Sequence, residues 1–189
     1  EIMDAFTQPG VHEVVVKSCS QIGKSDIMNN VIGRFAHLDP CSIMMVQPTV
    51  DMAEDFSKSR IEPMIQDTKV LTALFSDTGS RDRSNTILSK LFPGGRLIMG
   101  GANSPAGLAS RPIRILLCDE PTGALDYKTS KEILKLIETV NEKYGNTIIM
   151  VTHNDAIKDM ATRVVRLKDG MIRSNVINEK RLHAEDLEW

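Results

Sequence analysis

Two groups of residues in this chain combine side-chain types and an order that suit phosphate chemistry. The first is Ser-Cys-Ser-Gln-Ile-Gly-Lys-Ser at residues 18–25, which follows the β-branched run at residues 13–17. Between a strand and a helix, such a segment curls its backbone N–H groups around phosphate oxygens. Gly23 would let the backbone approach the phosphates, Lys24 would offer an ammonium group to the outer ones, and Ser25 would offer a hydroxyl to Mg²⁺.

One position of this segment departs from the usual phosphate-loop pattern, G-x-x-x-x-G-K-[ST]. Ser18 stands where the pattern has its first glycine. This departure puts the backbone geometry at Ser18 in question, but it does not argue against phosphate binding by the backbone N–H groups of the loop. An ordinary helix cap is the alternative interpretation of the Gly-Lys-Ser tripeptide. The residues expected to bind the nucleotide are Ser18, Cys19, Ser20, Gln21, Ile22, Gly23, Lys24 and Ser25.

The second group is the acidic pair Asp119-Glu120, which ends the apolar run at residues 113–118. Asp119 would reach Mg²⁺ directly or through water. Glu120 would act as the general base that polarises the attacking water. A capping pair at a strand end is the alternative, but an upstream phosphate loop favours chemistry. The two groups together indicate a nucleotide hydrolase that uses ATP and Mg²⁺, with Glu120 and Lys24 as catalytic residues.

Strand and helix signals alternate along the chain, which predicts an α/β fold with a mostly parallel sheet and helices on both faces. Residues 61–84 show a mixed pattern. Gly145 and Asn146 are expected to end a long amphipathic helix. We expect strands at 13–17, 42–47, 113–118 and 147–151, helices at 24–37, from 49 onward, at 129–144 and at 155–161, and hairpins at 86–99 and 163–177.

Length and composition are those of one globular domain. The chain has 189 residues, 41% of them apolar, and a net charge of −2, so no overall basic field indicates nucleic acid. Three widely spaced cysteines suit a reducing compartment, and we expect a cytoplasmic protein. No apolar run is long enough to span a membrane. We predict one domain over residues 1–180 and a loose tail over 181–189.

The segment from about residue 113 to 178 resembles ATP-binding cassette (ABC) ATPases of the lipoprotein and macrolide exporter type. The resemblance lies in Asp-Glu-Pro-Thr-Gly-Ala-Leu-Asp at 119–126, Thr-Ile-Ile-Met-Val-Thr-His at 147–153 and Val-Val-Arg-Leu-Lys-Asp-Gly at 164–170. It implies that His153 is the switch histidine that contacts the γ-phosphate, and that Asp126 is the D-loop aspartate. A histidine that merely ends a strand is the alternative for His153.

Residues 1–114 instead resemble the ATPase region of lambda-like phage terminase large subunits. The motifs are Val-Gln-Pro-Thr-Val-Asp-Met-Ala at 46–53, Phe-Pro-Gly-Gly at 92–95 and Gly-Ala-Asn-Ser-Pro-Ala-Gly-Leu-Ala-Ser-Arg-Pro at 101–112. Both resemblances imply a P-loop NTPase three-layer sandwich in which the strand at 147–151 lies beside the strand at 13–17. We interpret the chain as an engineered or hybrid protein whose two parts join near residues 113–120.

The two resemblances also imply what the chain should lack. No Leu-Ser-Gly-Gly-Gln signature precedes Asp119, so we do not expect the ATP-sandwich dimer of exporters. We expect slow ATP hydrolysis, with a non-catalytic scaffold or a motor fragment that needs DNA or partners as alternatives. Arg111 and Arg114 are candidate cation sources for the phosphate site, with ordinary solvated arginines as the alternative. The turn at 47–49 resembles a strand-end loop that touches DNA in translocases, which makes DNA a possible partner, with an ordinary turn as the alternative.

Overall fold

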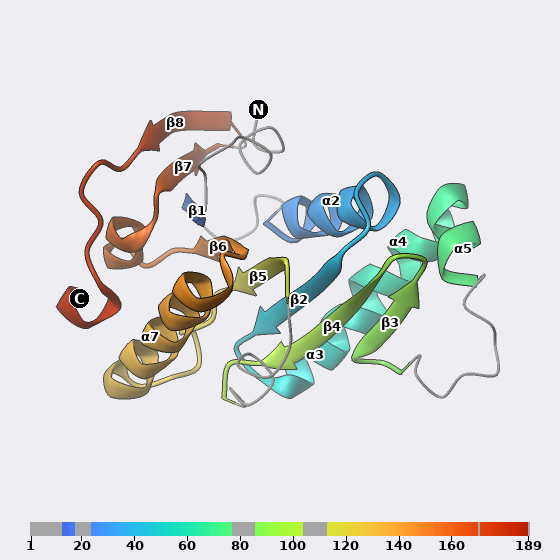
Figure 1. The fold of residues 1–189 in the computed structure, drawn as a ribbon, viewed down its shortest axis with the longest axis horizontal. Helices are drawn as coiled ribbons and strands as arrows, with labels where there is room; N and C mark the ends of the chain where they lie inside the picture. Colours follow the sequence, from blue (N-terminus) through green and yellow to red (C-terminus); the bar gives the residue numbers. More distant parts are fainter. Residues whose placement is uncertain (1–12, 18–23, 77–85, 104–112, 170, 189) are drawn as a thin grey trace.

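In the part of the chain that the structure describes, eight strands form one central sheet in the spatial order β3-β4-β2-β5-β6-β1-β7-β8 (Figure 1). The structure is a computed structural model, and it describes residues 13–17, 24–76, 86–103, 113–169 and 171–188. The strands are β1 (Glu13–Lys17), β2 (Ser42–Gln47), β3 (Ser89–Phe92), β4 (Gly95–Gly101), β5 (Ile115–Asp119), β6 (Thr147–Thr152), β7 (Arg163–Lys168) and β8 (Met171–Ile177).

The six inner strands run parallel, and an antiparallel hairpin closes each side of the sheet. β1 pairs with β6 and with β7, β2 pairs with β4 and with β5, and β5 pairs with β6. The hairpins β3–β4 and β7–β8 are antiparallel. The predicted neighbourhood of β1 and β6 is therefore confirmed, as are both hairpins.

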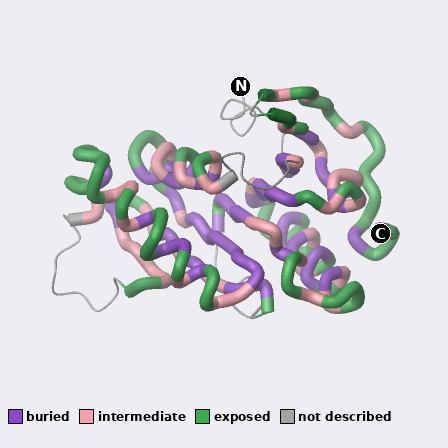
Figure 2. The backbone as a smooth tube through the Cα atoms, turned by 180° about the vertical axis from the view of Figure 1, so that it is seen from behind, coloured by how far each residue is buried: buried purple, intermediate pink, exposed green. Residues whose placement is uncertain are grey.

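Helices cover both faces of the sheet, which makes a three-layer sandwich (Figures 1 and 2). One face holds α2 (Lys24–His37), the continuous run α3 (Val50–Phe56), η1 (Ser57–Ile61) and α4 (Glu62–Asp67), and α5 (Lys69–Ser76). The other face holds α7 (Tyr127–Tyr144) with the short 3-10 turns η2 (Ala156–Met160) and η3 (Ala184–Asp186).

The alternation of side chains along each strand divides the core between these two faces. On β5, Ile115 and Leu117 pack with the α2 side, whereas Leu116 and Cys118 pack with the α7 side. Because side chains of a strand point alternately to opposite faces, a strand buried on both sides must be apolar throughout. This explains why the inner strands read as continuous apolar runs.

The helix ends follow the local sequence. Asp126 caps α7 by accepting hydrogen bonds from the Thr129 backbone N–H (3.0 Å) and hydroxyl (2.7 Å). α7 thus begins at Tyr127, two residues before the predicted start. At its other end Gly145 adopts φ 62°, the left-handed conformation that glycine takes without a steric cost, and its N–H donates to the Asn141 carbonyl. Thr49 caps α3 in the same way as Asp126.

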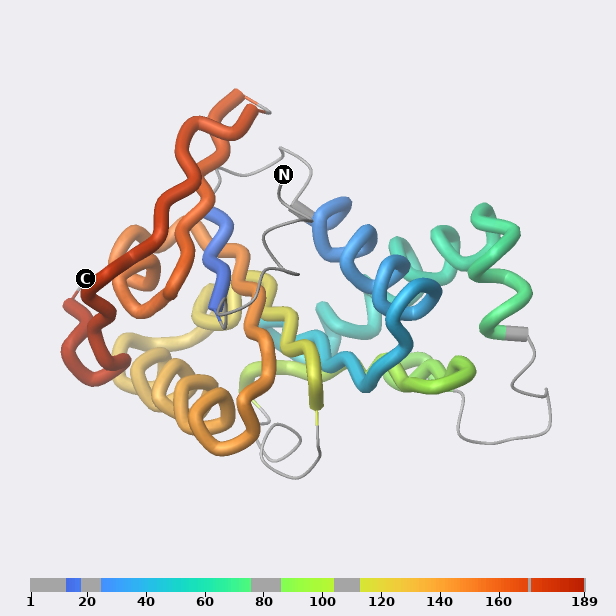
Figure 3. Tube along the Cα trace, turned by 45° about the horizontal axis from the view of Figure 1, so that its top comes forward, coloured from blue at the N-terminus to red at the C-terminus, as the bar shows by residue number. Residues whose placement is uncertain are grey.

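Two expectations about less regular segments need correction. The mixed stretch at 61–84 contains two helices, α4 and α5, separated at Thr68, which adopts an extended conformation. The expectation of a loose tail is wrong for residues 181–188. Ala184 and Leu187 are 0% and 1% exposed, and this C-terminal segment lies along α7 (Figures 1 and 3).

Candidate active site

The carboxyl ends of β5, β6 and β1 meet at one edge of the sheet. Asp119 lies opposite Val151, and Thr152 lies opposite Lys17. The connection after β1 runs through α2 on one face, whereas the connection after β5 runs through α7 on the other. A crevice where connections leave a parallel sheet toward opposite faces is the usual ligand-binding position of such folds.

The phosphate-loop candidates enter this edge from β1. Ser18 to Gly23 lie outside the described residues, so their contacts remain predictions. Lys24 is the first residue of α2, and Ser25 lies in its first turn. Because α2 links two parallel strands, it must run antiparallel to them, and its N-terminus returns to the edge where β1 ends. The positive end of the helix dipole thus lies at the edge that carries Asp119.

Glu120 has an unusual backbone conformation that directs its side chain. Its φ is 47°, in the left-handed region that costs a non-glycine residue about 1–2 kcal/mol. Two hydrogen bonds fix this turn: the Glu120 N–H donates to the Val151 carbonyl, and the Gly123 N–H donates to the Glu120 carbonyl, both at 2.9 Å. Strain of this kind, held by the surrounding structure, is often found at functional sites.

The carboxylate of Glu120 contacts His153. Glu120 Oε2 lies 2.8 Å from His153 Nδ1, and it also accepts a hydrogen bond from the His153 backbone N–H at 3.3 Å. The Glu120 side chain is 19% exposed and the His153 ring 69% exposed. A half-buried carboxylate and an exposed imidazole therefore form a pair at the open edge of the sheet. The structure thus brings together two of the three predicted catalytic side chains.

Asp119 has a partner that the sequence did not reveal. Gln47, the last residue of β2, is buried, and its Nε2 donates to Asp119 Oδ2 at 3.4 Å. The Asp119 carboxylate and the Ser25 hydroxyl are hard oxygen ligands, the kind that Mg²⁺ prefers. The residues at this edge therefore suit a magnesium ion. Gln47 orients Asp119 from inside the protein, which makes the turn at 47–49 a support of the site.

The loop that carries His153 is held by two lysines that both pair with Asp155. Lys17 Nζ, at the end of β1, donates a hydrogen bond to Asp155 Oδ1, and Lys158 Nζ lies 3.0 Å from Asp155 Oδ2. Hydrogen bonds from Lys17 and then Lys158 lower the pKa of Asp155 to about 2. The Asn154 N–H also donates to the Thr152 hydroxyl at 3.1 Å. These contacts fix the position of His153 relative to β1.

Several other candidates lie away from this edge. Arg114 precedes β5 at the opposite edge and forms a bidentate pair with Asp39, at 2.6 and 2.8 Å, so it is no cation source for the site. Arg111 lies outside the described residues. Cys41 and Cys118 are buried, and burial raises the pKa of both thiols, so neither is a nucleophile at neutral pH.

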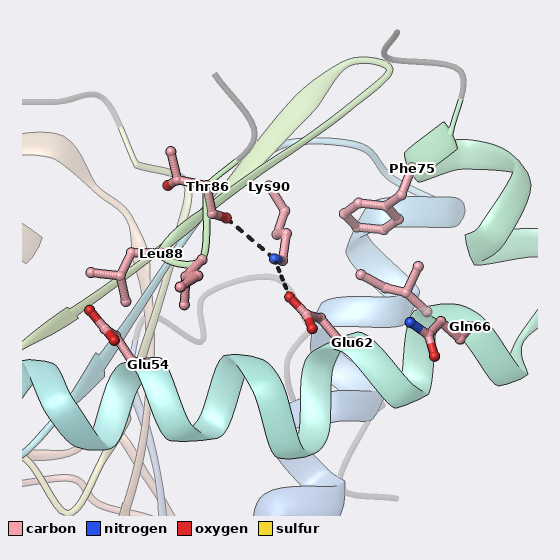
Figure 4. A pocket seen from close by; sticks show the side chains of 9 residues that line it. Glu54, Glu62, Gln66, Phe75, Thr86, Leu88 and Lys90 are labelled. Carbon is pink, nitrogen blue, oxygen red and sulfur yellow. Dashed lines mark hydrogen bonds and ion pairs between the residues drawn. The ribbon is translucent and has the colours of Figure 1, made fainter. Parts of the chain in front are cut away.

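A pocket of about 800 Å³ also lies away from the site (Figure 4). It opens between the α3–α4 helix and the β3 strand, with Ile65 and Phe75 among its apolar residues. The ion pair between Lys90 Nζ and Glu62 Oε1 (2.9 Å) crosses it. None of its described residues comes from the ends of β1, β5 or β6. The candidate site is therefore the sheet edge and not this pocket.

The chain belongs to the family of ATPase domains of the phage terminase large subunit gpA, whose family model matches residues 1–174. The match extends beyond residue 114, where we expected the terminase resemblance to end. It confirms the terminase part of the predicted resemblance, and together with the parallel sheet it defines a P-loop ATPase fold.

The chain is also similar to ABC proteins, as predicted. It is 47% identical over 62 residues to a putative ABC transporter ATP-binding protein of Mycoplasma pneumoniae, covering 33% of this chain and 18% of that protein. It is 37% identical over 106 residues to the macrolide export ATP-binding/permease protein MacB of Syntrophobacter fumaroxidans, covering 51% and 15%. The chain thus spans less than a fifth of the length of these two relatives.

Solved structures of both classes resemble this chain. The ATPase domain of the Thermus phage P74-26 large terminase is 15% identical, with a TM-score of 0.49 over 80% of this chain and 63% of that one. The ATP-binding cassette MJ0796, solved as a dimer bound to ADP and Pi, is 19% identical, with a TM-score of 0.49 over 91% and 87%. Among the described residues, no helix is long and apolar enough to cross a membrane.

Proposed function

We propose that this chain binds Mg²⁺-ATP at the carboxyl edge of its sheet and hydrolyses it slowly. The observation that carries the proposal is the Glu120–His153 contact at the ends of β5 and β6, beside the strand that leads into the phosphate-loop sequence. A general base must lie within hydrogen-bond reach of its substrate water, in a site where phosphates can be held nearby.

The residues of the site divide the tasks of this mechanism. The amides of residues 18–23, with Lys24, would hold the phosphates, and Ser25 and Asp119 would hold Mg²⁺. The bound ion would neutralise charge on the phosphate oxygens. Glu120 would orient a water for in-line attack on the γ-phosphorus and accept its proton, while the bond from that phosphorus to the bridging oxygen breaks and ADP leaves. His153 would position the Glu120 carboxylate through Nδ1 and face the γ-phosphate from the end of β6.

We propose slow turnover because an exporter ATPase needs the Leu-Ser-Gly-Gly-Gln signature of a second copy to close over ATP, and no such signature precedes Asp119.

A hybrid origin is the second part of the proposal. The similarity to ABC proteins covers only part of the chain, whereas the terminase family model covers residues 1–174. Both families place an acidic pair after an apolar strand, so a junction near residues 113–120 would keep strand, metal ligand and base in register. The presence of both similarities in one chain supports the interpretation of an engineered or hybrid ATPase, and the terminase family model runs through this junction to residue 174.

The direct test of chemistry is phosphate release by the wild type and by Glu120→Gln. The substitution preserves shape but removes the base, so turnover should fall about 10²- to 10⁴-fold while nucleotide binding is retained. Glu132→Gln, a change at an exposed glutamate of α7, is the matched control and should leave turnover unchanged. Equal turnover in wild type and Glu120→Gln would eliminate Glu120 as the base. Binding without any turnover in the wild type would favour the non-catalytic scaffold.

Membership of a terminase family favours one further possibility, a motor fragment that hydrolyses ATP only with DNA present. The same assay with added double-stranded DNA separates this from autonomous hydrolysis. If DNA leaves the rate unchanged, the chain acts alone. If only the DNA-containing samples release phosphate, the autonomous reaction proposed above is wrong.

A further inference from the structure

A second cluster of ionisable groups lies on α7, on the side where the C-terminal segment packs. This segment runs antiparallel to the helix. The Tyr127 hydroxyl contacts the Leu187 carbonyl, Lys135 Nζ pairs with Glu185 at 2.7 Å, and Glu138 contacts His183. Figures 1 and 3 show the C-terminus beside α7. The cluster consists of Glu138, Glu142 and His183.

The three side chains offer ligand atoms that lie within 4.8 Å of one another. Glu138 and Glu142 are four residues apart on α7, so they share one face of the helix. His183 Nδ1 lies 2.9 Å from Glu138 Oε1, and the Ala184 backbone N–H donates to Glu138 Oε2 at 3.1 Å. One carboxylate is thus oriented by a backbone amide, as carboxylates that bind metals often are.

His183 is held in place on both sides, which distinguishes it from a histidine on a loose tail. Before it, the Leu182 N–H donates to the Asp159 carbonyl at 2.9 Å, and Arg181 pairs with Glu13 at 3.1 Å. After it, Ala184 and Leu187 are buried against α7. The segment therefore presents the imidazole to the two glutamates without a further folding step.

The charges around the cluster would be relieved by a cation. Burial raises the pKa of Glu13 to about 7; Arg181 opposes this shift, and the negative charges of Glu138 and Glu142 add to it. Three carboxylates thus crowd this end of α7 and the start of β1. A divalent ion between Glu138, Glu142 and His183 would neutralise the two helix carboxylates.

We propose that Glu138, Glu142 and His183 form a binding site for a divalent transition-metal ion such as Zn²⁺, which fastens the C-terminal segment to α7. One imidazole and two carboxylates match the ligands of Zn²⁺ and of neighbouring metals, whereas Mg²⁺ and Ca²⁺ prefer oxygen alone. Metal–ligand bonds of about 2.0–2.2 Å in a tetrahedron separate ligand atoms by about 3.3 Å. Rotation of the exposed Glu142 side chain would close the remaining distance, and water would complete the coordination.

The test is a Co²⁺ titration of the full chain after treatment with a chelator, with Zn²⁺ competition. Co²⁺ reports its ligands by visible absorption, and thiolate ligands add charge-transfer bands in the near ultraviolet. We expect one ion per chain with a Kd of about micromolar or below, no thiolate bands, and displacement by Zn²⁺. Zn²⁺ should also raise the Tm of the wild type.

Two variants and two controls assign the site. His183→Ala and Glu142→Gln should each weaken binding at least about tenfold and abolish the rise in Tm. Glu142 is exposed, so its substitution leaves the fold intact. His37→Ala changes another exposed histidine, and His153→Ala changes the histidine of the proposed ATP site. Both should bind as the wild type does. Thiolate bands, binding weakened only by His153→Ala, or equal affinity in Glu142→Gln and wild type would overturn the proposal.

Discussion

At the scale of single residues, the backbone of Glu120 is the feature that most directly links sequence to chemistry. Its left-handed conformation, φ 47°, places the carboxylate against His153, whose own position depends on the Lys17–Asp155 pair. The acidic pair was predicted because it ends an apolar strand, whereas His153 was predicted from the resemblance to ABC ATPases. The roles of Gln47 and Asp155 could not be predicted, because they depend on which strands are neighbours, and the spacing of residues in the sequence does not reveal the strand order.

His153→Ala should lower ATP turnover about 10- to 100-fold. This is the value of one hydrogen bond to a charged group, and the Glu120 carboxylate would lose its orienting contact. Single-turnover phosphate release measures the effect, with His37→Ala as the control at an exposed histidine. A His153→Ala protein as fast as the wild type would mean that the histidine only ends β6.

At the scale of elements, the strands and most helices follow from apolar patterns and caps. The buried runs predicted β1, β2, β5 and β6 closely, and Gly145 predicted the end of α7. The separate helices α4 and α5 were missed, because each is short and Pro63 and Thr68 interrupt the helical spacing. The packed C-terminal segment was missed as well. Its two buried residues, Ala184 and Leu187, are too few to produce a recognisable hydrophobic periodicity in the sequence.

A substitution of Asp126 separates its role as the N-terminal cap of α7 from the catalytic role of a D-loop aspartate. It caps α7 through Thr129, so Asp126→Ala should lower the Tm by about 2–4 °C. ATP turnover should hardly change, because the cross-dimer role of a D-loop aspartate requires an exporter-type partner. Thermal unfolding and phosphate release of one preparation provide both values. Large loss of turnover with an unchanged Tm would assign Asp126 to the active site.

The start of β1 should make stability depend on pH. Burial raises the pKa of Glu13 from 4.5 to about 7, so the folded state favours its protonated form. Ionisation of Glu13 therefore does not affect the free energy of unfolding below pH 4.5. As the pH rises from 4.5 to 7, it lowers the free energy of unfolding progressively, by about 3 kcal/mol in total.

Glu13→Gln removes this titration. Urea unfolding of both proteins at several pH values should show the variant gaining stability relative to the wild type between pH 4.5 and 7, with a constant difference above pH 7. A difference that does not change with pH would show that Glu13 ionises normally. Arg181, its partner at 3.1 Å, remains in both proteins.

At the scale of the whole molecule, the two resemblances predict different assemblies. An exporter ATPase closes two copies around ATP through its signature sequence, and that sequence is not found before Asp119. We therefore expect no ATP-dependent increase in mass. Light scattering of Glu120→Gln with Mg²⁺-ATP is the sensitive measurement, since slow hydrolysis would preserve a closed dimer. A doubling of mass on addition of ATP would show that the exporter assembly survives in this chain.

The central claim is that nucleotide phosphates bind where β1 leads into α2. Titration of a fluorescent ATP analogue with Mg²⁺ into wild type, Lys24→Ala and Lys128→Ala tests it most directly. Lys128 lies in the first turn of α7 and serves as a matched helix-start control. We expect Lys24→Ala to lose most of the affinity while Lys128→Ala binds as the wild type does. Equal affinity of Lys24→Ala and wild type would contradict the account.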